Sequence, residues 1–286
     1  MVKGFKKNIQ IYRNIEFSAR NVLASDIVES ERSLGCKFVN IDVSDRNMMR
    51  EQTLEWNPTH ILHFAQDRSF NIVKNDRTPP EEQVKVNIEG LKNVLDLASE
   101  LKLKYLSHTF EGRMGYMETL RQADQICDDY RTKNQLDVRV LKIPFVIDYI
   151  KNENFHMPQD LIRCTIAEQT KFPMISMTDA TDAMFNLIMA NEKKLHKTVY
   201  SISGATYPFG DVAKGIRKMN YKFRHQFLLP SEISEQDRQM KQILESMPDS
   251  MDESESILDW SWQYKKPKKL QNFIENVYEK IIEFNN

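Results

Sequence analysis

The segment Glu81–Ser107 reads EEQVKVNIEGLKNVLDLASELKLKYLS and decides the fold class. Its apolar residues recur at steps of three and four, which predicts an amphipathic helix from Glu81 to Leu103. The run from Lys104 to Ser107 then predicts the start of a strand. The recurring apolar positions of the helix are Val84, Ile88, Leu91, Leu95 and Ala98.

Strand and helix patterns alternate on both sides of this segment. Asp45 has the position of a helix N-cap, and Asn57-Pro58 is a turn signal. An alternation of this kind favours βαβ units, and therefore an α/β fold with a parallel sheet. The predicted strands are Asn21–Asp26, Lys37–Asp42, His60–Ala65 and Val138–Ile147, and the flanking predicted helices are 45–55 and 116–133.

The sequence divides into two unequal parts that we expect to pack as one unit. Residues 1–147 carry the alternation, and residues 148–286 form a smaller, mixed, helix-rich region. The second part includes an acidic, flexible-looking stretch, Ser246–Glu255, and a last amphipathic helix, Leu270–Phe284.

Composition excludes several classes of function. The formal net charge is −1, which gives no general attraction to nucleic acid or to an anionic membrane. No apolar run approaches ~18 residues, so we predict no transmembrane segment. The three cysteines are far apart, have no metal-ligand spacing and favour a reducing compartment. We therefore expect neither a bound metal nor a nucleic-acid partner.

Several segments fall in the order of a known family. Asn21–Asp26 (NVLASD) and His60–Ala65 (HILHFA) resemble the second and fourth strands of extended short-chain dehydrogenases/reductases. Val86–Leu95 (VNIEGLKNVL) is similar to the V-N-x-x-G-x-x-N-V-L helix of that family. The chain thus resembles the NAD-dependent epimerase/dehydratase superfamily, which implies a Rossmann-like parallel sheet.

Segments of the second half narrow this resemblance. Leu136–Pro144, Phe172–Ala180 and Pro248–Trp262 look like parts of short-chain-type L-threonine 3-dehydrogenases. These strings indicate ancestry and do not by themselves establish activity. Within the last of them, we expect Trp260 and Trp262 to be structural and to lock the C-terminal region onto the small domain.

The resemblance implies a dinucleotide site whose phosphate loop is missing here. The family binds the pyrophosphate at a G-x-x-G-x-x-G loop after its first strand, where any Cβ would block the approach. No glycine occurs between Gly4 and Gly35. Residues 8–12 could be the first strand, but Arg13–Phe17 (RNIEF) then replaces the loop, and a full helix does not fit. We therefore expect a truncated N-terminal βα unit and no cofactor.

Four residues stand where the resemblance places contacts to the cofactor. Asp26 matches the acid that holds the adenosine ribose, and Asp42 and Val43 match the pair that meets the adenine. Ala65 matches the end of the fourth strand. Without the glycine loop, an acid that merely caps a strand end is the favoured interpretation of Asp26. We expect all four positions to be vestigial.

The catalytic positions implied by the resemblance are also incomplete. Tyr116 opens the helix that carries the family's Tyr-x-x-x-Lys pair, but the lysine position is Leu120. Thr109 lies where the family has its catalytic serine or threonine. A tyrosine ordinarily titrates near ~10, and a leucine cannot lower that pKa. We expect Tyr116 and Thr109 to be vestigial.

These observations predict a catalytically inactive protein that acts as a structural or accessory subunit of a larger assembly. The family includes mitochondrial enzymes, and dehydrogenase-fold subunits occur in respiratory complex I, which favours a mitochondrial complex over a cytoplasmic protein. The first twenty residues are basic, which fits either a transit peptide or a solvated leader. We expect a partner protein to pack near Val22 and Leu23.

Two other functions remain open from the sequence. One is a divergent NAD-dependent dehydrogenase or epimerase with an unusual phosphate site, acting on a small hydroxy or amino acid such as L-threonine. The other is a regulatory protein that binds a small ligand in the old cleft.

Overall fold

The main sheet is parallel throughout. The computed structural model describes residues 21–28, 35–67, 81–109, 115–147, 162–219, 223–234, 237–238, 241, 245, 248–264, 267 and 269–275. In the largest sheet the strand order is β3-β4-β5-β9, and every pair is parallel. The predicted α/β fold is confirmed. The strands are β3 (His60–His63), β4 (Lys104–Thr109), β5 (Val138–Lys142) and β9 (Val199–Ser201).

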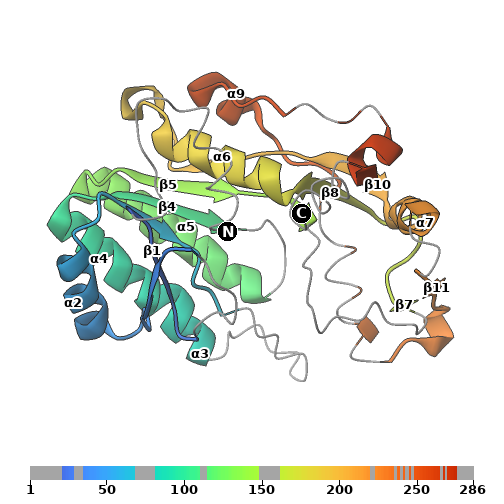
Figure 1. Ribbon diagram of the computed structural model, residues 1–286, viewed down its shortest axis with the longest axis horizontal. Helices are drawn as coiled ribbons and strands as arrows, with labels where there is room; N and C mark the ends of the chain where they lie inside the picture. The colour runs from blue at the N-terminus through green and yellow to red at the C-terminus, as the bar shows by residue number, and fades with distance from the viewer. Residues whose placement is uncertain are drawn as a thin grey trace.

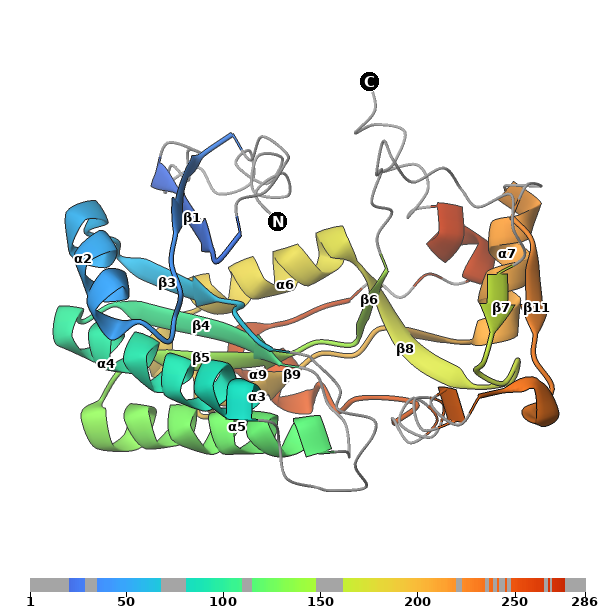
Figure 2. The same cartoon turned by 90° about the horizontal axis from the view of Figure 1, so that it is seen from below.

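Helices cover both faces of this sheet (Figure 1). Helices α4 (Leu91–Leu101) and α5 (Gly115–Asn134) lie against one face, with α2 (Arg46–Trp56) beside α4. Figure 2 shows α6 (Met177–Met189) against the opposite face, where α9 (Ser254–Trp260) packs on β9. Side chains along β5 point alternately to the two faces of the sheet. Val138 and Val140 therefore belong to the core under α4 and α5, whereas Leu141 belongs to the core under α6.

Two strands near the N-terminus form a separate parallel pair. Strand β1 (Leu23–Asp26) pairs with β2 (Lys37–Asn40), and within the described ranges β1 pairs with no strand of the larger sheet. The predicted strand Asn21–Asp26 is confirmed as β1, whose first two residues are half-buried, whereas Ser25 and Asp26 are exposed. The predicted first strand, residues 8–12, lies outside the described residues.

Helix α2 begins and ends with the expected signals. The Asp45 side chain accepts hydrogen bonds from the backbone N–H groups of Asn47 and Met48, which confirms its predicted capping role. The helix ends at Trp56, and Asn57 adopts the left-handed conformation at φ 50°.

The long helix predicted from Glu81 contains a π-helical turn. Helix α3 (Glu81–Val84) continues through this turn (Lys85–Gly90) into α4. Gly90 closes against Val43, because a Cβ at Gly90 would lie 2.6 Å from a methyl carbon of that side chain. The turn therefore docks onto the loop that follows β2.

The predicted strand Val138–Ile147 is in fact two strands in two sheets. Pro144 cannot donate to a ladder, and β5 ends two residues before it. The chain continues as β6 (Phe145–Ile147) in a smaller sheet of order β10-β8-β6. Its other strands are β8 (Lys171–Ser176), which is parallel to β6, and β10 (Ala205–Pro208), which is antiparallel to β8.

The remaining elements complete the smaller region. Strand β7 (Ile162–Cys164) pairs with β11 (His225–Phe227), and α7 (Phe209–Met219) packs on β10. The division of the chain at residues 147 and 148 stays a prediction, although β9, from the second part, completes the larger sheet. Only residues 270–275 of the predicted last helix lie within the described chain, and they are helical.

The acidic stretch after residue 246 is docked onto the protein where it is described. Met251 is buried, and the Glu253 carboxylate accepts a hydrogen bond from the Ser203 backbone N–H over 3.0 Å. Trp262 is buried in the core between α6 and the larger sheet. Trp260 and Trp262 belong to one core cluster, which includes residues of β8 and α6 from the second part of the chain and Leu141 of β5. This packing agrees with the expected structural role, and the locking of the C-terminal region onto the small domain stays a prediction.

Candidate functional site

The site predicted from the resemblance lies along the carboxyl edge of the parallel strands. Asp26 ends β1, Ala65 follows β3, and Thr109 ends β4. Thr109 is the register partner of Lys142, the last residue of β5. Ligands of open parallel sheets bind outside these strand ends. The fold thus brings Ala65, Thr109 and Lys142 to one edge.

Asp26 supports a turn at the end of β1. Its Oδ1 accepts a hydrogen bond from the Ile27 backbone N–H over 2.7 Å, and the Asn40 side chain donates to the Ile27 carbonyl oxygen. The side chain of Asp26 is exposed. This geometry is that of a strand-end acid which also remains accessible to a ligand.

Asp42 and Val43 form an ordered turn after β2. Asp42 Oδ1 accepts from the backbone N–H and the hydroxyl of Ser44, at 2.8 and 2.7 Å. These hydrogen bonds hold the pKa of Asp42 below its usual value. Asn93 donates from its side chain to the Val43 carbonyl oxygen over 3.0 Å, which ties the turn to α4. These hydrogen bonds therefore hold Asp42 and Val43, the two residues that the resemblance places next to the adenine, in a fixed turn.

Asn87 in the π-helical turn holds the segment that follows β3. Its Oδ1 accepts from the Asp67 backbone N–H at 2.8 Å, and its Nδ2 donates to the Asp67 carbonyl oxygen at 3.0 Å. Nδ2 also lies 3.3 Å from the Thr119 hydroxyl on α5. Asn87 thus connects the segment after β3 to the π-helical turn and to α5.

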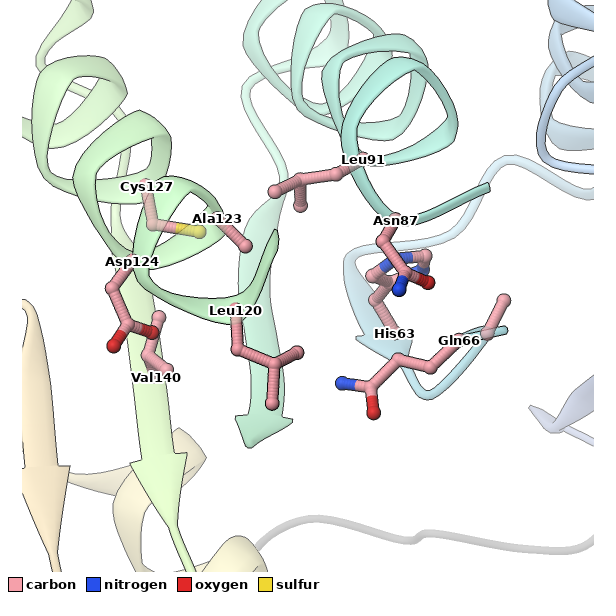
Figure 3. Close-up of a pocket in the computed structure, with 10 residues that line it drawn as sticks. His63, Gln66, Asn87, Leu91, Leu120, Ala123, Asp124, Cys127 and Val140 are labelled. Carbon is pink, nitrogen blue, oxygen red and sulfur yellow. The ribbon is translucent and has the colours of Figure 1, made fainter. Parts of the chain in front are cut away.

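A small pocket opens between β3, the π-helical turn and α5 (Figure 3). Burial lowers the pKa of His63 to about 4, so its imidazole is neutral at pH 7. Burial also raises the pKa of the Cys127 thiol, which is therefore protonated. The pocket is lined by His63, Ala65, Gln66, Asn87, Leu91, Leu120, Ala123, Asp124, Cys127 and Val140.

Helix α5 carries two of the predicted catalytic positions, residues 116 and 120, and the second of them lies at this pocket. Tyr116 lies in its first turn, and its side chain falls outside the described residues, as does that of Thr109. Leu120, at the predicted lysine position, is buried and lines the pocket. The structure thus places a hydrocarbon where the family pattern has an amine.

One ion pair beside the pocket was not anticipated from the sequence. Lys142 Nζ lies 3.2 Å from Asp124 Oδ2, and both side chains are mostly buried. Two signals could have indicated it. Asp124 lies one helical turn after Leu120, and Lys142 shares the α5-facing side of its strand with Val140.

Two further classes of site find no support in the described part of the chain. Its histidine, cysteine and acidic side chains form no group of three that could hold a metal ion. Among the helices described, none is both long and apolar enough to cross a bilayer.

Comparisons with known proteins agree with this geometry. No family model matches the chain. An uncharacterized epimerase/dehydratase of Staphylococcus saprophyticus is 24% identical over 277 residues, spanning 85% of this chain and 83% of its own length. The mitochondrial L-threonine 3-dehydrogenase of Sus scrofa is 22% identical over 288 residues, spanning 87% and 72%. The structure of L-threonine dehydrogenase from Clostridium difficile superimposes with a TM-score of 0.78 at 23% identity, covering 99% of this chain and 94% of that one.

These similarities confirm the predicted resemblance and correct one prediction. The fold is that of extended short-chain dehydrogenases/reductases, and the relatives are epimerases/dehydratases and L-threonine 3-dehydrogenases. The prediction that this chain is not an enzyme is contradicted, because the proteins that it resembles over most of its length are enzymes.

Proposed function

We propose that this protein, which has the extended short-chain dehydrogenase fold, is a divergent NAD-dependent oxidoreductase acting on a small hydroxy or amino acid such as L-threonine. The observation that carries the proposal is the edge where β3, β4 and β5 end, where Thr109 is the register partner of Lys142 and Ala65 lines a pocket next to α5. The similarity to L-threonine dehydrogenases over nearly the whole chain supports the same substrate class.

The described residues fit two parts of a bound dinucleotide. Asp26 presents an exposed carboxylate for ribose hydroxyls, and the Asp42–Val43 turn is held firmly by Ser44 and Asn93 for an adenine ring. Ala65, directly after β3, is small and exposed, which suits the nicotinamide half. Bound NAD would supply the hydride acceptor. The residues that would face the pyrophosphate lie outside the described ranges.

The chemical roles follow from the resemblance and form part of the proposal. The Tyr116 hydroxyl would take a proton from the substrate alcohol, and the Thr109 hydroxyl would orient that alcohol by a hydrogen bond. The pocket is lined in part by the apolar side chains of Leu120 and Ala123, which favours a compact substrate. Because Leu120 stands at the lysine position and carries no charge, a positive charge that lowers the pKa of Tyr116 would have to come from another element.

The test uses the purified full chain. We expect NAD binding by isothermal titration calorimetry, and NAD reduction with at least one member of a panel of hydroxy acids and hydroxy amino acids that includes L-threonine. Tyr116→Phe should lose most of this turnover. Tyr130→Phe, on the same helix and bonded to Asp96 away from the pocket, should keep it. Interconversion of a UDP-sugar without net NAD reduction would instead identify an epimerase. Absence of both activities would overturn the proposal.

The partner and the cellular location stay predictions. A mitochondrial location is supported by mitochondrial L-threonine 3-dehydrogenases of Sus scrofa and Bos taurus, which are distant relatives. Cell fractionation tests it against a cytoplasmic location. The predicted hetero-oligomeric partner near Val22 and Leu23 is tested by cross-linking of native material, and a chain that cross-links to no other protein would contradict it.

A further inference from the structure

We propose that the imidazole of His63 binds an alcohol hydroxyl of the ligand, inside the pocket between β3, the π-helical turn and α5. The inference deepens the proposed function and rests on it for the source of that hydroxyl. Two sources share this chemistry, namely the hydroxy acid and the ribose next to the nicotinamide of the cofactor. Binding experiments with matched ligands distinguish them.

His63 is a buried polar side chain whose ring nitrogens form no hydrogen bond within the described part of the chain. Only 7% of the residue is exposed. Its ring packs against that of Tyr105 on β4, with the ring centroids 5.9 Å apart. Polar groups buried in this way are almost always hydrogen-bonded, so an exception calls for a partner from outside the protein. Because His63 lines the pocket and is otherwise enclosed, the accessible part of its ring faces this space.

The neighbouring polar groups of the pocket already have partners. Figure 3 shows His63 beside Asn87, across the pocket from Leu120. The Asn87 amide is hydrogen-bonded to the backbone of Asp67. The Asp124 carboxylate forms an ion pair with a lysine. His63 is therefore a lining residue whose hydrogen-bonding capacity is left for a ligand.

The chemistry of the ring selects an uncharged group. Burial lowers the pKa of His63 to about 4, so at pH 7 one ring nitrogen carries a proton and the other a lone pair. A hydroxyl both donates and accepts, and thus matches either nitrogen. A carboxylate or an ammonium group would have to lose its hydration beside a neutral ring, which is unfavourable.

The size of the pocket limits the group that can enter. Its enclosed space is about 20 Å³. Because a cavity of ~10–15 Å³ holds one water molecule, a hydroxyl fits here, whereas a carboxamide with its three heavy atoms does not. Ala65 is exposed and also lines the pocket, so the pocket opens at the carboxyl edge of the sheet. A ligand bound outside the strand ends can reach His63 past Ala65.

The decisive experiment follows the ring nitrogens of His63 in the full chain by long-range ¹H–¹⁵N NMR at pH 7. His63→Phe identifies their resonances. L-threonine should shift them, and L-2-aminobutyrate, which lacks only the hydroxyl, should not. L-lactate and propionate form a second pair of this kind. A shift with either hydroxy acid and not with its partner supports the inference and assigns the hydroxyl to the substrate.

The cofactor is tested in the same way. NAD is compared with an analogue whose nicotinamide ribose lacks both hydroxyls. A shift with NAD alone supports the inference and assigns the hydroxyl to the ribose. Equal shifts within every pair, or no shift with any of these compounds, would overturn the inference.

Variants separate a binding role from a structural one. His63→Phe keeps the ring but removes its nitrogens, so calorimetry should show roughly tenfold weaker binding of the hydroxyl-bearing ligand and unchanged binding of its hydroxyl-free partner. His63→Gln, which returns an amide to this position, should recover part of the loss. His60→Phe is the matched control, because residue 60 lies three positions earlier on the same strand and faces the other side of the sheet. Equal losses for both members of a pair in His63→Phe would show a structural role and contradict the inference.

Turnover distinguishes this inference from the proposed function. A shift of His63 by a hydroxy acid in a wild type that never reduces NAD would support the binding role and contradict the proposed function. NAD reduction with the same kcat/KM in His63→Phe and the wild type would contradict the binding role and leave the proposed function intact. If His63→Phe does not fold, the NMR comparison of the matched ligands on the wild type decides.

Discussion

The side-chain amide of Asn87 pairs with the backbone of Asp67 through two hydrogen bonds, accepting from its N–H at 2.8 Å and donating to its carbonyl oxygen at 3.0 Å. One side-chain amide thereby satisfies both backbone groups of Asp67. Because Asn87 is buried and lies in the π-helical turn, this contact ties the position of the segment after β3 to the geometry of the helix.

Substitution of Asn87 should loosen this segment. Asn87→Ala leaves the part-buried backbone groups of Asp67 without these two hydrogen bonds, which should cost about 1–3 kcal/mol in the free energy of unfolding. Asn87→Asp keeps an acceptor for the N–H but sets a carboxylate against the Asp67 carbonyl oxygen, so it should be no more stable than the alanine variant. Urea denaturation measures both values. An unchanged midpoint for Asn87→Ala would show that the amide pair contributes nothing.

Arg139 should be among the most sensitive positions for stability. Its fully buried guanidinium pairs with Asp137 at 2.7 Å and also donates to the carbonyl oxygens of Leu187, Ile188 and Ala190 at the end of α6. Arg139→Met leaves a mostly buried carboxylate unpaired, which should cost about 3–5 kcal/mol.

A matched variant separates burial from ion pairing. Arg50 pairs with Glu100 over 2.6 Å, a similar distance, but both side chains are largely exposed. Arg50→Met should therefore change the denaturation midpoint little, because solvent screens exposed pairs. Equal losses in Arg50→Met and Arg139→Met would show that burial does not set the cost.

His63 should make folding stability depend on pH. Its pKa is about 4 in the folded protein and about 6.5 when exposed, because burial penalises the charged imidazole. Between these values the unfolded chain binds the extra proton, so stability is full above about pH 6.5 and falls as the pH drops towards 4, by up to about 3 kcal/mol. His63→Phe should remove this part of the pH dependence in urea melts. An equally steep dependence in the variant would assign it to other groups.

Local signals in the sequence predicted much of the fold. Asp45 capped the helix where its spacing indicated, and the alternation around Glu81–Ser107 indicated a parallel sheet. Features that depend on tertiary context escaped prediction. An apolar run such as VRVLKIPFVI does not reveal that its two halves join different sheets across Pro144. The small change of helical phase in the π-helical turn was also hidden, because the apolar spacing tolerates both kinds of turn.

The candidate site shows the same limit. The resemblance placed Ala65, Thr109 and Leu120 at the correct strand ends and helix turn. It did not reveal Asp124 and Lys142, since their pairing depends on the phase of α5 relative to the pleat of β5, 18 residues apart in the chain. Motif positions alone therefore indicate the leucine at residue 120 but not the ion pair between Lys142 and Asp124.

The π-helical turn at Lys85–Gly90 has a consequence for how this chain can change length. Such a turn holds one residue more than the α-helical turn it replaces. Deleting a single residue there would restore a uniform α-helix and rotate everything before the turn by about 100° relative to α4. Asn87 would then turn away from Asp67, and the two hydrogen bonds between them would be lost. Single-residue deletions in this turn should therefore destabilise the fold even where each remaining side chain is preserved, because the number of residues in the turn sets the direction in which Asn87 points.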